Sequence, residues 1–377
     1  MRIFRNELML RNIKYFFLFL FVVSCIEPYE FVVPADSRAL VVEAFISDKS
    51  FSDTKSYPSD GRYFSATLSY TSDVTNVRSE LISGASVSLV NDLGEQWDYT
   101  ESSDSPGTYY LIDDDFKALK GIRYKLKAFP PNDDSYETDW EEMPAADIPA
   151  MGEIGFAETE VQRYQIEANK PVLNSIKGVT ANISLPANSK KEKAFYRWEF
   201  NPTWIYIAPL VSVSNPGYRC WATSNTYISD YILQTDVAGG YKKDLFFLET
   251  IRNERLFEDF SALVLQYSMS EEYYSFWNEM QQKALGGALF DAPPYNLKSN
   301  WHAMEEDKAV SGYFGVVQEQ AKRWYFNKGD LSYYVENTMK ADCLVVYGPG
   351  GPAEECLDCR FYSFGTTTTT KPAWWRE

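Results

Sequence analysis

Short stretches in which apolar and polar residues alternate set the tightest constraint on how this chain can fold. An apolar run at residues 40–46 is followed by alternating stretches at 64–70, 85–89 and 122–128, with glycines and an Asn-Asp pair between them. A period of two is typical of strands that are buried on one face, and Gly, Asn and Asp favour the connecting turns. The pattern therefore predicts an antiparallel β-sandwich over residues 39–145.

A second β-rich region is expected after a boundary rich in proline and acidic residues. Residues 130–149 have this composition, and 377 residues are about twice the usual domain length of roughly 100–200. We therefore predict an Ig-like or carboxypeptidase-regulatory-like sandwich at 39–145 and a β-rich domain at 150–365. Strands of the second domain are expected at 178–185, 195–207, 244–250, 261–267, 311–325, 331–336 and 344–347.

One helix is predicted in the second domain. Ser268 to Glu271 match a capping box, in which a serine and a glutamate three residues later satisfy free backbone N–H groups. Apolar residues then recur at helical spacing until Gly286 and Gly287, which favour the end of a helix. A single aromatic stripe of this kind predicts a helix packed on a sheet. Its apolar residues are Tyr273, Phe276, Trp277, Met280 and Ala284.

The first 24 residues have the composition of an export signal. Basic residues precede an apolar core at 15–23, which is too short to span a bilayer, since spanning needs about 20 residues. Cys25 follows Val-Val-Ser directly, as in the bacterial lipobox, and no Ala-x-Ala cleavage site lies near it. We therefore expect residues 1–24 to be removed, Cys25 to be acylated and residues 25–38 to form a tether. The alternative is an ordinary secretory signal followed by an incidental cysteine.

The overall composition is that of an acidic chain with enough apolar residues to fold. Hydrophobic residues make up 45% of it, which suffices for substantial cores and excludes a disordered stalk. A formal net charge of −17 argues against nucleic acid as a partner, because phosphate contacts need clustered Lys and Arg. An acidic protein is also repelled by anionic lipid surfaces, so attachment to a membrane would depend on the acyl anchor.

Four cysteines follow Cys25, namely Cys220, Cys343, Cys356 and Cys359. An even number in an exported protein favours two disulfides, for which three pairings exist. Cys356 and Cys359 form a C-x-x-C motif, which also occurs in redox and zinc sites. The chain has a single histidine and no βαβ pattern around this motif, so structural bridges are favoured. We expect Cys356 and Cys359 each to pair with Cys220 or Cys343, in either order. A bridge within the motif is the alternative.

No catalytic or metal-binding motif stands out. His302 is the sole histidine and no G-x-S-x-G elbow accompanies it, so a serine or cysteine triad is not expected. Asp113 to Asp115 lack the glycine and distal glutamate of an EF-hand, which favours a solvated loop. A carboxylate pair for glycoside hydrolysis is an open alternative, but no sequence feature selects one. We predict no enzymatic activity, no catalytic residue, no metal and no cofactor.

Aromatic residues are the other candidates for binding. Most of the 10 Trp and 27 Tyr are expected to fill β cores. Trp374 and Trp375 are harder to assign to a core, because they lie in a C-terminal tail (366–377) that begins with five threonines. We predict that they dock either on the rest of the fold or on a partner. Other candidates for stacking on a sugar or a partner are Trp204, Tyr206, Trp221 and Trp324.

Several motifs, taken in their order, resemble the domain-of-unknown-function-4249 family of Bacteroidetes lipoproteins. They are the lipobox with Glu27-Pro28, the stretches 40–46, 82–87, 107–109, 121–126, 289–294, 312–314, 356–360 and 367–372, and Trp374-Trp375. The resemblance implies an outer-membrane or cell-surface lipoprotein, often encoded beside a SusC-like TonB-dependent transporter. No activity is established for the family, so the resemblance assigns no catalytic residue.

Three functions are consistent with these observations. The first is a non-enzymatic lipoprotein anchored in the outer membrane through Cys25, on the periplasmic side or, preferably, the cell surface. It would act as an accessory to a SusC-like TonB-dependent barrel in nutrient capture or uptake. The second is a stand-alone surface module that binds a glycan or a peptide or mediates adhesion. The third is an envelope hydrolase that uses carboxylates.

Overall fold

Strands dominate the structure. They account for 45% of it and helices for 12%, which confirms the prediction of a mainly β protein. The predicted signal peptide, Cys25, the tether and the Gly286-Gly287 stop lie outside the described residues. None of the described helices is long and apolar enough to cross a membrane. The computed structural model describes residues 39–71, 80–132, 134–146, 148–188, 192–285, 297–305, 308–345 and 351–376.

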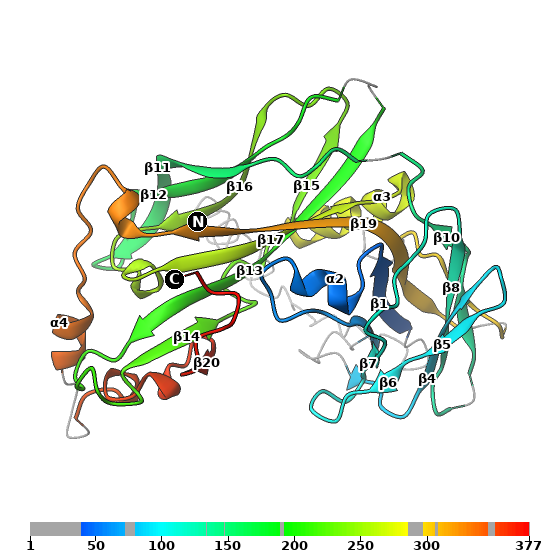
Figure 1. Ribbon diagram of the computed structural model, residues 1–377, viewed down its shortest axis with the longest axis horizontal. Helices are drawn as coiled ribbons and strands as arrows, with labels where there is room; N and C mark the ends of the chain where they lie inside the picture. Colours follow the sequence, from blue (N-terminus) through cyan, green and yellow to red (C-terminus); the bar gives the residue numbers. More distant parts are fainter. Residues whose placement is uncertain are drawn as a thin grey trace, which may run out of the picture.

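A large sheet of 11 strands runs through the molecule (Figure 1). Near its middle, β19 (Val310–Phe326) pairs antiparallel with β17 and parallel with β1. In order, its strands are β20 (Thr366–Thr368), β14 (Arg219–Thr223), β13 (Ala194–Ile207), β17 (Phe260–Ser268), β19, β1 (Leu40–Ser47), β2 (Phe64–Tyr70), β7 (Thr108–Leu111) and β6 (Thr100–Glu101), with β15 (Ile232–Asp236) on β13 and β3 (Glu80–Leu81) on β2.

The predicted N-terminal sandwich is confirmed. Its first layer is the β1–β2–β7 end of the large sheet, and its second layer is a six-stranded sheet. Alternate residues of both layers are buried between them, for example Leu40 and Val42 of β1 and Tyr124 and Leu126 of β8. The second sheet consists of β18 (Trp301–Ala303), β9 (Tyr136–Thr138), β8 (Arg123–Phe129), β4 (Ser86–Asn91) and β5 (Gln96–Asp98), with β10 (Glu141–Glu142) on β8.

The large sheet crosses the sequence position at which we placed a domain boundary. β1 pairs in parallel with β19 from Leu40↔Val310 to Ser47↔Val317. Gly312 permits this close approach, because a Cβ at that position would lie 2.0 Å from the carbonyl oxygen of Val42. The division into 39–145 and 150–365 stays a prediction, but β18 and β19 contribute to the N-terminal sandwich although they lie far beyond residue 150.

A three-stranded sheet covers the other half of the large sheet. It contains β11 (Ile154–Glu167), β12 (Lys170–Ser184) and β16 (Lys242–Glu249). β11 and β12 form a long hairpin that turns at Ala168 and Asn169, both at positive φ, as tight hairpin turns require. Apolar residues of β12 and β16 pack with Trp and Phe side chains of β13, β17 and β19 in one core. These residues include Val179, Ala181, Leu248, Trp198, Phe260 and Trp324.

The predicted helix is present as α3 (Glu271–Leu285) and packs on the large sheet. Tyr273 and Phe276 lie in one apolar cluster with Phe195 of β13 and Tyr313 of β19. The helix cap differs from the expected one. Ser270, rather than Ser268, accepts a hydrogen bond from the backbone N–H of Tyr273 at 3.2 Å.

Other differences concern short segments. Residues 331–336 form no strand but follow a 3₁₀ turn (Lys328–Asp330), and Leu344 belongs to α4 (Met339–Leu344), while 346–347 lie outside the described residues. The prediction also omitted α2 (Phe51–Lys55), a single turn that begins with a Ser50–Asp53 capping box. Short apolar runs fit a strand or a helix equally well, because periodicity needs more residues to distinguish them.

Candidate functional site

Two adjoining cavities near the C-terminal end of the chain have the size of ligand sites. Their volumes are about 590 and 450 Å³, and they share Arg255 and Phe364 as lining residues. We refer to the two together as the C-terminal groove. The larger cavity is also lined by Thr223, Ser224, Asn225, Thr226, Tyr227, Ser363, Gly365 and Thr366. The smaller is also lined by Tyr206, Glu254, Met339, Asp342, Cys343, Val345, Ala353, Glu355, Cys356 and Tyr362.

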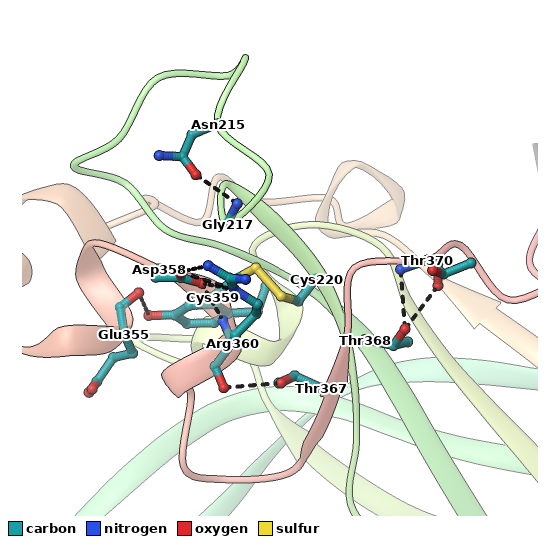
Figure 2. The surroundings of a disulfide bond; sticks show 11 residues. Asn215, Gly217, Cys220, Glu355, Asp358, Cys359, Arg360, Thr367, Thr368 and Thr370 are labelled. Carbon is teal, nitrogen blue, oxygen red and sulfur yellow. Dashed lines mark hydrogen bonds and ion pairs between the residues drawn. A yellow bond between two sulfur atoms is a disulfide. The ribbon is translucent and has the colours of Figure 1, made fainter.

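Two disulfides hold the walls of this groove. Cys220 of β14 pairs with Cys359, with Cα atoms 5.6 Å apart, and Cys343 of α4 pairs with Cys356, with Cα atoms 5.8 Å apart. The expectation of two disulfides is therefore confirmed. The pairing is one of the two orders preferred from the sequence. Figure 2 shows how the first bridge attaches the 355–360 segment to the end of β14.

A second set of contacts fixes the same segment. Arg360 binds Asp358 through its backbone N–H at 2.9 Å and through its guanidinium (Figure 2). These hydrogen bonds from Arg360 lower the pKa of the Asp358 carboxyl to about 2. Cys359 donates its N–H to the carbonyl of Gly217 at 2.8 Å. A Cβ at position 217 would lie 2.5 Å from the Asp358 carboxylate, so a larger residue there would displace that side chain.

Tyr362 joins this segment to the core. Its ring stacks on that of Tyr206 with centroids 4.2 Å apart, and its hydroxyl donates to Glu254 Oε1 at 2.8 Å. Burial, and then the charge of Glu254, raise the pKa of the Tyr362 hydroxyl above its usual value. Tyr362 therefore keeps its proton and serves as a permanent donor to Glu254.

Arg255 is the cation that both cavities share. Its guanidinium lies 4.4 Å from the ring centroid of Tyr227 and 5.5 Å from that of Phe364, and it pairs with Glu254 at 3.0 Å. Its Nε is buried and has no hydrogen-bond partner in the described part of the chain. Arg255 is thus held in place by aromatic faces, with one donor not used by the fold.

The lining of the larger cavity is rich in hydroxyl groups. The pairing of β20 with β14 places Thr366 opposite Thr223, and Ser224 and Thr226 share a hydrogen bond of 3.0 Å nearby. The side chain of Phe364 borders these groups and is 58% exposed. Hydroxyls and an amide beside an open aromatic ring suit a ligand with many polar groups and a flat apolar face, such as a sugar.

The structure brings some predicted site residues to the groove and places others elsewhere. Of the four disulfide cysteines, Cys343 and Cys356 line the groove, whereas Cys220 and Cys359 are fully buried and do not line it. Trp374 and Trp375 dock on the fold: Trp375 is 6% exposed and packs with Ile205 and Trp221, and Trp374 lies over Arg323. Of the other aromatic candidates, Tyr206 lines the groove, while Trp204, Trp221 and Trp324 are buried.

Sequence reasoning did not identify Arg255 or Phe364. Neither belongs to a recognisable motif, and they are 109 positions apart in the chain. His302 is exposed, with Nε2 3.0 Å from Asp139 Oδ1. Within the described ranges, no group of three or more His, Cys, Asp or Glu residues has a geometry that could hold a metal ion.

The protein is thus mainly β, and its C-terminal groove has the size of a ligand site and is stabilised by two disulfides. The model of a family described as Domain of unknown function (DUF4249) matches residues 26–323, so the chain belongs to this family. The matched range ends within β19. The stretches 356–360 and 367–372 and Trp374-Trp375, which contributed to the resemblance, therefore lie beyond it, as do α4 and β20.

Comparison with solved structures finds a DUF4785 family protein from Legionella pneumophila subsp. pneumophila str. Philadelphia 1. The two chains are 11% identical with a TM-score of 0.16, and the alignment covers 60% of this chain and 52% of that one. The chain thus spans about half the length of that protein. A comparison with curated proteins finds no match.

Proposed function

We propose that the protein is a non-enzymatic outer-membrane lipoprotein that captures a ligand in the C-terminal groove for a TonB-dependent transporter. The observation that carries this proposal is the groove itself, a preformed site whose walls are cross-linked by Cys220–Cys359 and Cys343–Cys356. Its two volumes fall within the roughly 300–1,000 Å³ typical of small-molecule sites. Acylation of Cys25 rests on the sequence pattern around it.

The lining supports a glycan as the ligand. Sugars bind through hydrogen bonds to their hydroxyls and through stacking of their apolar face on an aromatic ring. Thr366 and Asn225 offer the first kind of contact, and the exposed ring of Phe364 offers the second. Arg255 adds a charged donor group to the lining of both cavities.

The tip of the β11–β12 hairpin supports a protein partner. Tyr164 and Ile166 are each 71% exposed, and Leu173, which pairs with Tyr164, is 51% exposed. Alternate residues of a strand and their cross-strand partners share one face, so these three side chains form an apolar patch. Exposed apolar patches are typical of interaction sites, and we assign this one to the transporter.

The first experiment tests anchor and partner together. The tagged full-length protein is purified from its native membrane in mild detergent, and its companions are identified by mass spectrometry. We expect a large β-barrel to co-purify, and Cys25→Ala to abolish membrane association. Recovery without a barrel would overturn the accessory role and leave a stand-alone binding module. Membrane association of Cys25→Ala would refute the lipobox.

The second experiment tests the groove. The detergent-solubilised full-length protein is screened against a glycan array, and Kd values of hits are measured by calorimetry. We expect Phe364→Ala and Arg255→Gln each to weaken binding at least tenfold. Phe129→Ala and Arg123→Gln, which remove exposed side chains of β8, are the matched controls and should bind as the parent does. Equal binding by the groove variants, or no hit, would contradict a glycan site in the groove.

A further inference from the structure

A further, smaller cavity lies under the C-terminal tail. It shares one lining residue, Thr223, with the C-terminal groove. Its volume is about 260 Å³. The segment 54–62 after β1, the strands β13, β17 and β19, and the side chain of Trp374 all contribute to its walls. We refer to it as the tail pocket. A buried water occupies about 30 Å³, so the cavity has room for a small molecule rather than for one water.

Trp374 closes the pocket on the tail side. Its ring lies 3.5 Å from the guanidinium carbon of Arg323, and its indole N–H donates to Asp60 Oδ1 at 2.9 Å. The backbone carbonyl of Trp374 accepts from the hydroxyl of Tyr325 at 3.0 Å. Arg376 then pairs with Asp259 at 2.9 Å. The tail is therefore held over the pocket by a stacked cation, two hydrogen bonds and an ion pair.

Arg323 is a half-buried cation that forms no ion pair with a carboxylate among the described residues. Its Nε donates to the carbonyl of Pro58 at 2.5 Å and its Nη1 to Ser261 Oγ at 3.2 Å, and both acceptors are uncharged. Burial lowers the pKa of its guanidinium to about 10, and the charges of Tyr325 and Asp60 oppose this shift only in part. An arginine without an ion-pair partner can bind a carboxylate in a bidentate manner.

Three other residues that line the pocket have buried polar atoms without a partner. Glu319 is 1% exposed, and its Oε2 binds Ser47 and Arg62, whereas its Oε1 has no hydrogen bond within the described residues. Asn201 Oδ1 and Arg62 Nε lack one likewise. Buried polar groups in folded proteins nearly always have a hydrogen-bond partner, so three without one around a single cavity need an explanation.

We propose that the tail pocket binds a carboxylate of the size of an amino acid or a uronic acid, with hydrogen-bond donors next to its carboxyl group. The carboxylate pairs with Arg323. The ammonium or hydroxyl groups donate to Asn201 Oδ1 and Glu319 Oε1, the acceptors that the fold leaves free. The indole of Trp374 covers the bound molecule, and Leu263 and Leu265 give the pocket an apolar wall.

The test uses calorimetry on the full-length protein in detergent. The probes are the free L-amino acids, D-glucuronate and D-galacturonate, with amino-acid amides and D-glucose as counterparts that lack the carboxylate. We expect at least one carboxylate to bind and its counterpart without the carboxylate to bind at least tenfold more weakly. Binding by an amino acid identifies the ammonium as the donor, and binding by a uronate identifies the hydroxyls. If no carboxylate binds with Kd below 10 mM, or if the counterpart binds equally well, the proposal is wrong.

Variants place the binding at the tail pocket. We expect Arg323→Gln to weaken it at least tenfold, and Asn201→Leu, which keeps the size of the side chain but removes the acceptor Oδ1, to do the same. Arg163→Gln, at an exposed arginine of β11, is the matched control. Melting temperatures confirm folding, and if Arg323→Gln does not fold, Asn201→Leu decides. Binding that survives in Asn201→Leu, or that is lost in Arg255→Gln instead, would overturn the proposal. The latter would assign the ligand to the C-terminal groove.

Discussion

Glu141 of β10 is a residue whose charge is set by the fold. Burial raises the pKa of its carboxyl to about 7 from its usual value of 4.5. Asn300 and Tyr313 donate to its Oε1 at 2.8 and 3.2 Å and oppose this shift, while the charge of Glu272 adds to it. A raised carboxyl pKa means that the folded state binds the proton more tightly than the unfolded state. The contribution of Glu141 to stability is therefore greatest below pH 4.5, falls as the pH rises from 4.5 to 7, and stays reduced above 7.

We predict that Glu141→Gln removes this dependence. The amide oxygen of glutamine still accepts from Asn300 and Tyr313 but never ionises. At about 1.4 kcal/mol per unit of pKa, the variant should raise the free energy of unfolding by roughly 1–3 kcal/mol at pH 8 and hardly at pH 4.5. Denaturant titrations at both pH values measure this, with Glu142→Gln at the exposed neighbour as the control. An equal gain at both pH values would show that Glu141 is not titrating as proposed.

The limits of sequence reasoning are clearest for single residues. The four cysteines were found because their number and compartment predict bridges by themselves. Arg255, Phe364, Arg323 and Glu141 carried no such signal, since an arginine or a glutamate has the same sequence pattern on a solvated face as in a cavity. What makes these residues candidates is burial and missing partners, and both depend on contacts between distant segments.

A strand or helix could be predicted where its own sequence contains a long enough pattern of apolar residues on one face. α3 and the strands β13, β17 and β19 have apolar patterns long enough to be recognised. β11 and the outer half of β12 were missed because both faces of the hairpin tip are exposed, so neither face contributes a run of buried residues although Tyr164 and Ile166 alternate with polar ones. β20 was assigned to a tail because three threonines reveal a strand only when they pair with β14.

We predict unequal contributions from the two disulfides. The bond Cys220–Cys359 closes a loop of 139 residues, and Cys343–Cys356 one of 13. Loop-closure entropy gives about 5 kcal/mol for the first and about 3 kcal/mol for the second, as upper estimates. Replacing Cys220 and Cys359 by alanine should therefore lower the free energy of unfolding more than replacing Cys343 and Cys356. Urea unfolding of both double variants measures the difference, and the reverse order would refute the loop-length argument.

The hairpin tip should matter for association and little for folding. Tyr164→Ser combined with Ile166→Ser removes two exposed side chains, so we expect the free energy of unfolding to stay within about 0.5 kcal/mol of the parent. The same variant should lose the barrel in the co-purification experiment. Arg163→Ser with Gln165→Ser changes the opposite face of the same strand and is the matched control. Loss of the barrel in both variants, or in neither, would show that the apolar face is not the contact.

At the scale of the whole molecule, the continuous sheet has a thermodynamic consequence. The alternation of apolar and polar residues predicts which face of a strand is buried but not which strand lies beside it. The β1–β19 pairing therefore could not be predicted from the sequence. That pairing joins the N-terminal sandwich to the rest through eight consecutive residue pairs. Because β19 belongs to both cores, neither can lose it without exposing apolar surface in the other. The described chain should thus unfold as one cooperative unit.

Gly312 gives a direct test of this cooperativity. An alanine there would place its Cβ 2.0 Å from Val42 O at a φ of +111°, so Gly312→Ala should cost roughly 3 kcal/mol or more. If the β1–β19 pairing couples the N-terminal sandwich to the rest of the molecule, the free energy of hydrogen-exchange protection should fall by the same amount in β8 and in β12. These two strands lie on opposite sides of the β1–β19 pairing. Gly84→Ala is the control, because its φ is +77° with open space around it, and it should cost only about 1 kcal/mol. Protection lost in β8 but kept in β12 would mean that the sandwich unfolds independently, as the boundary near residue 150 would require.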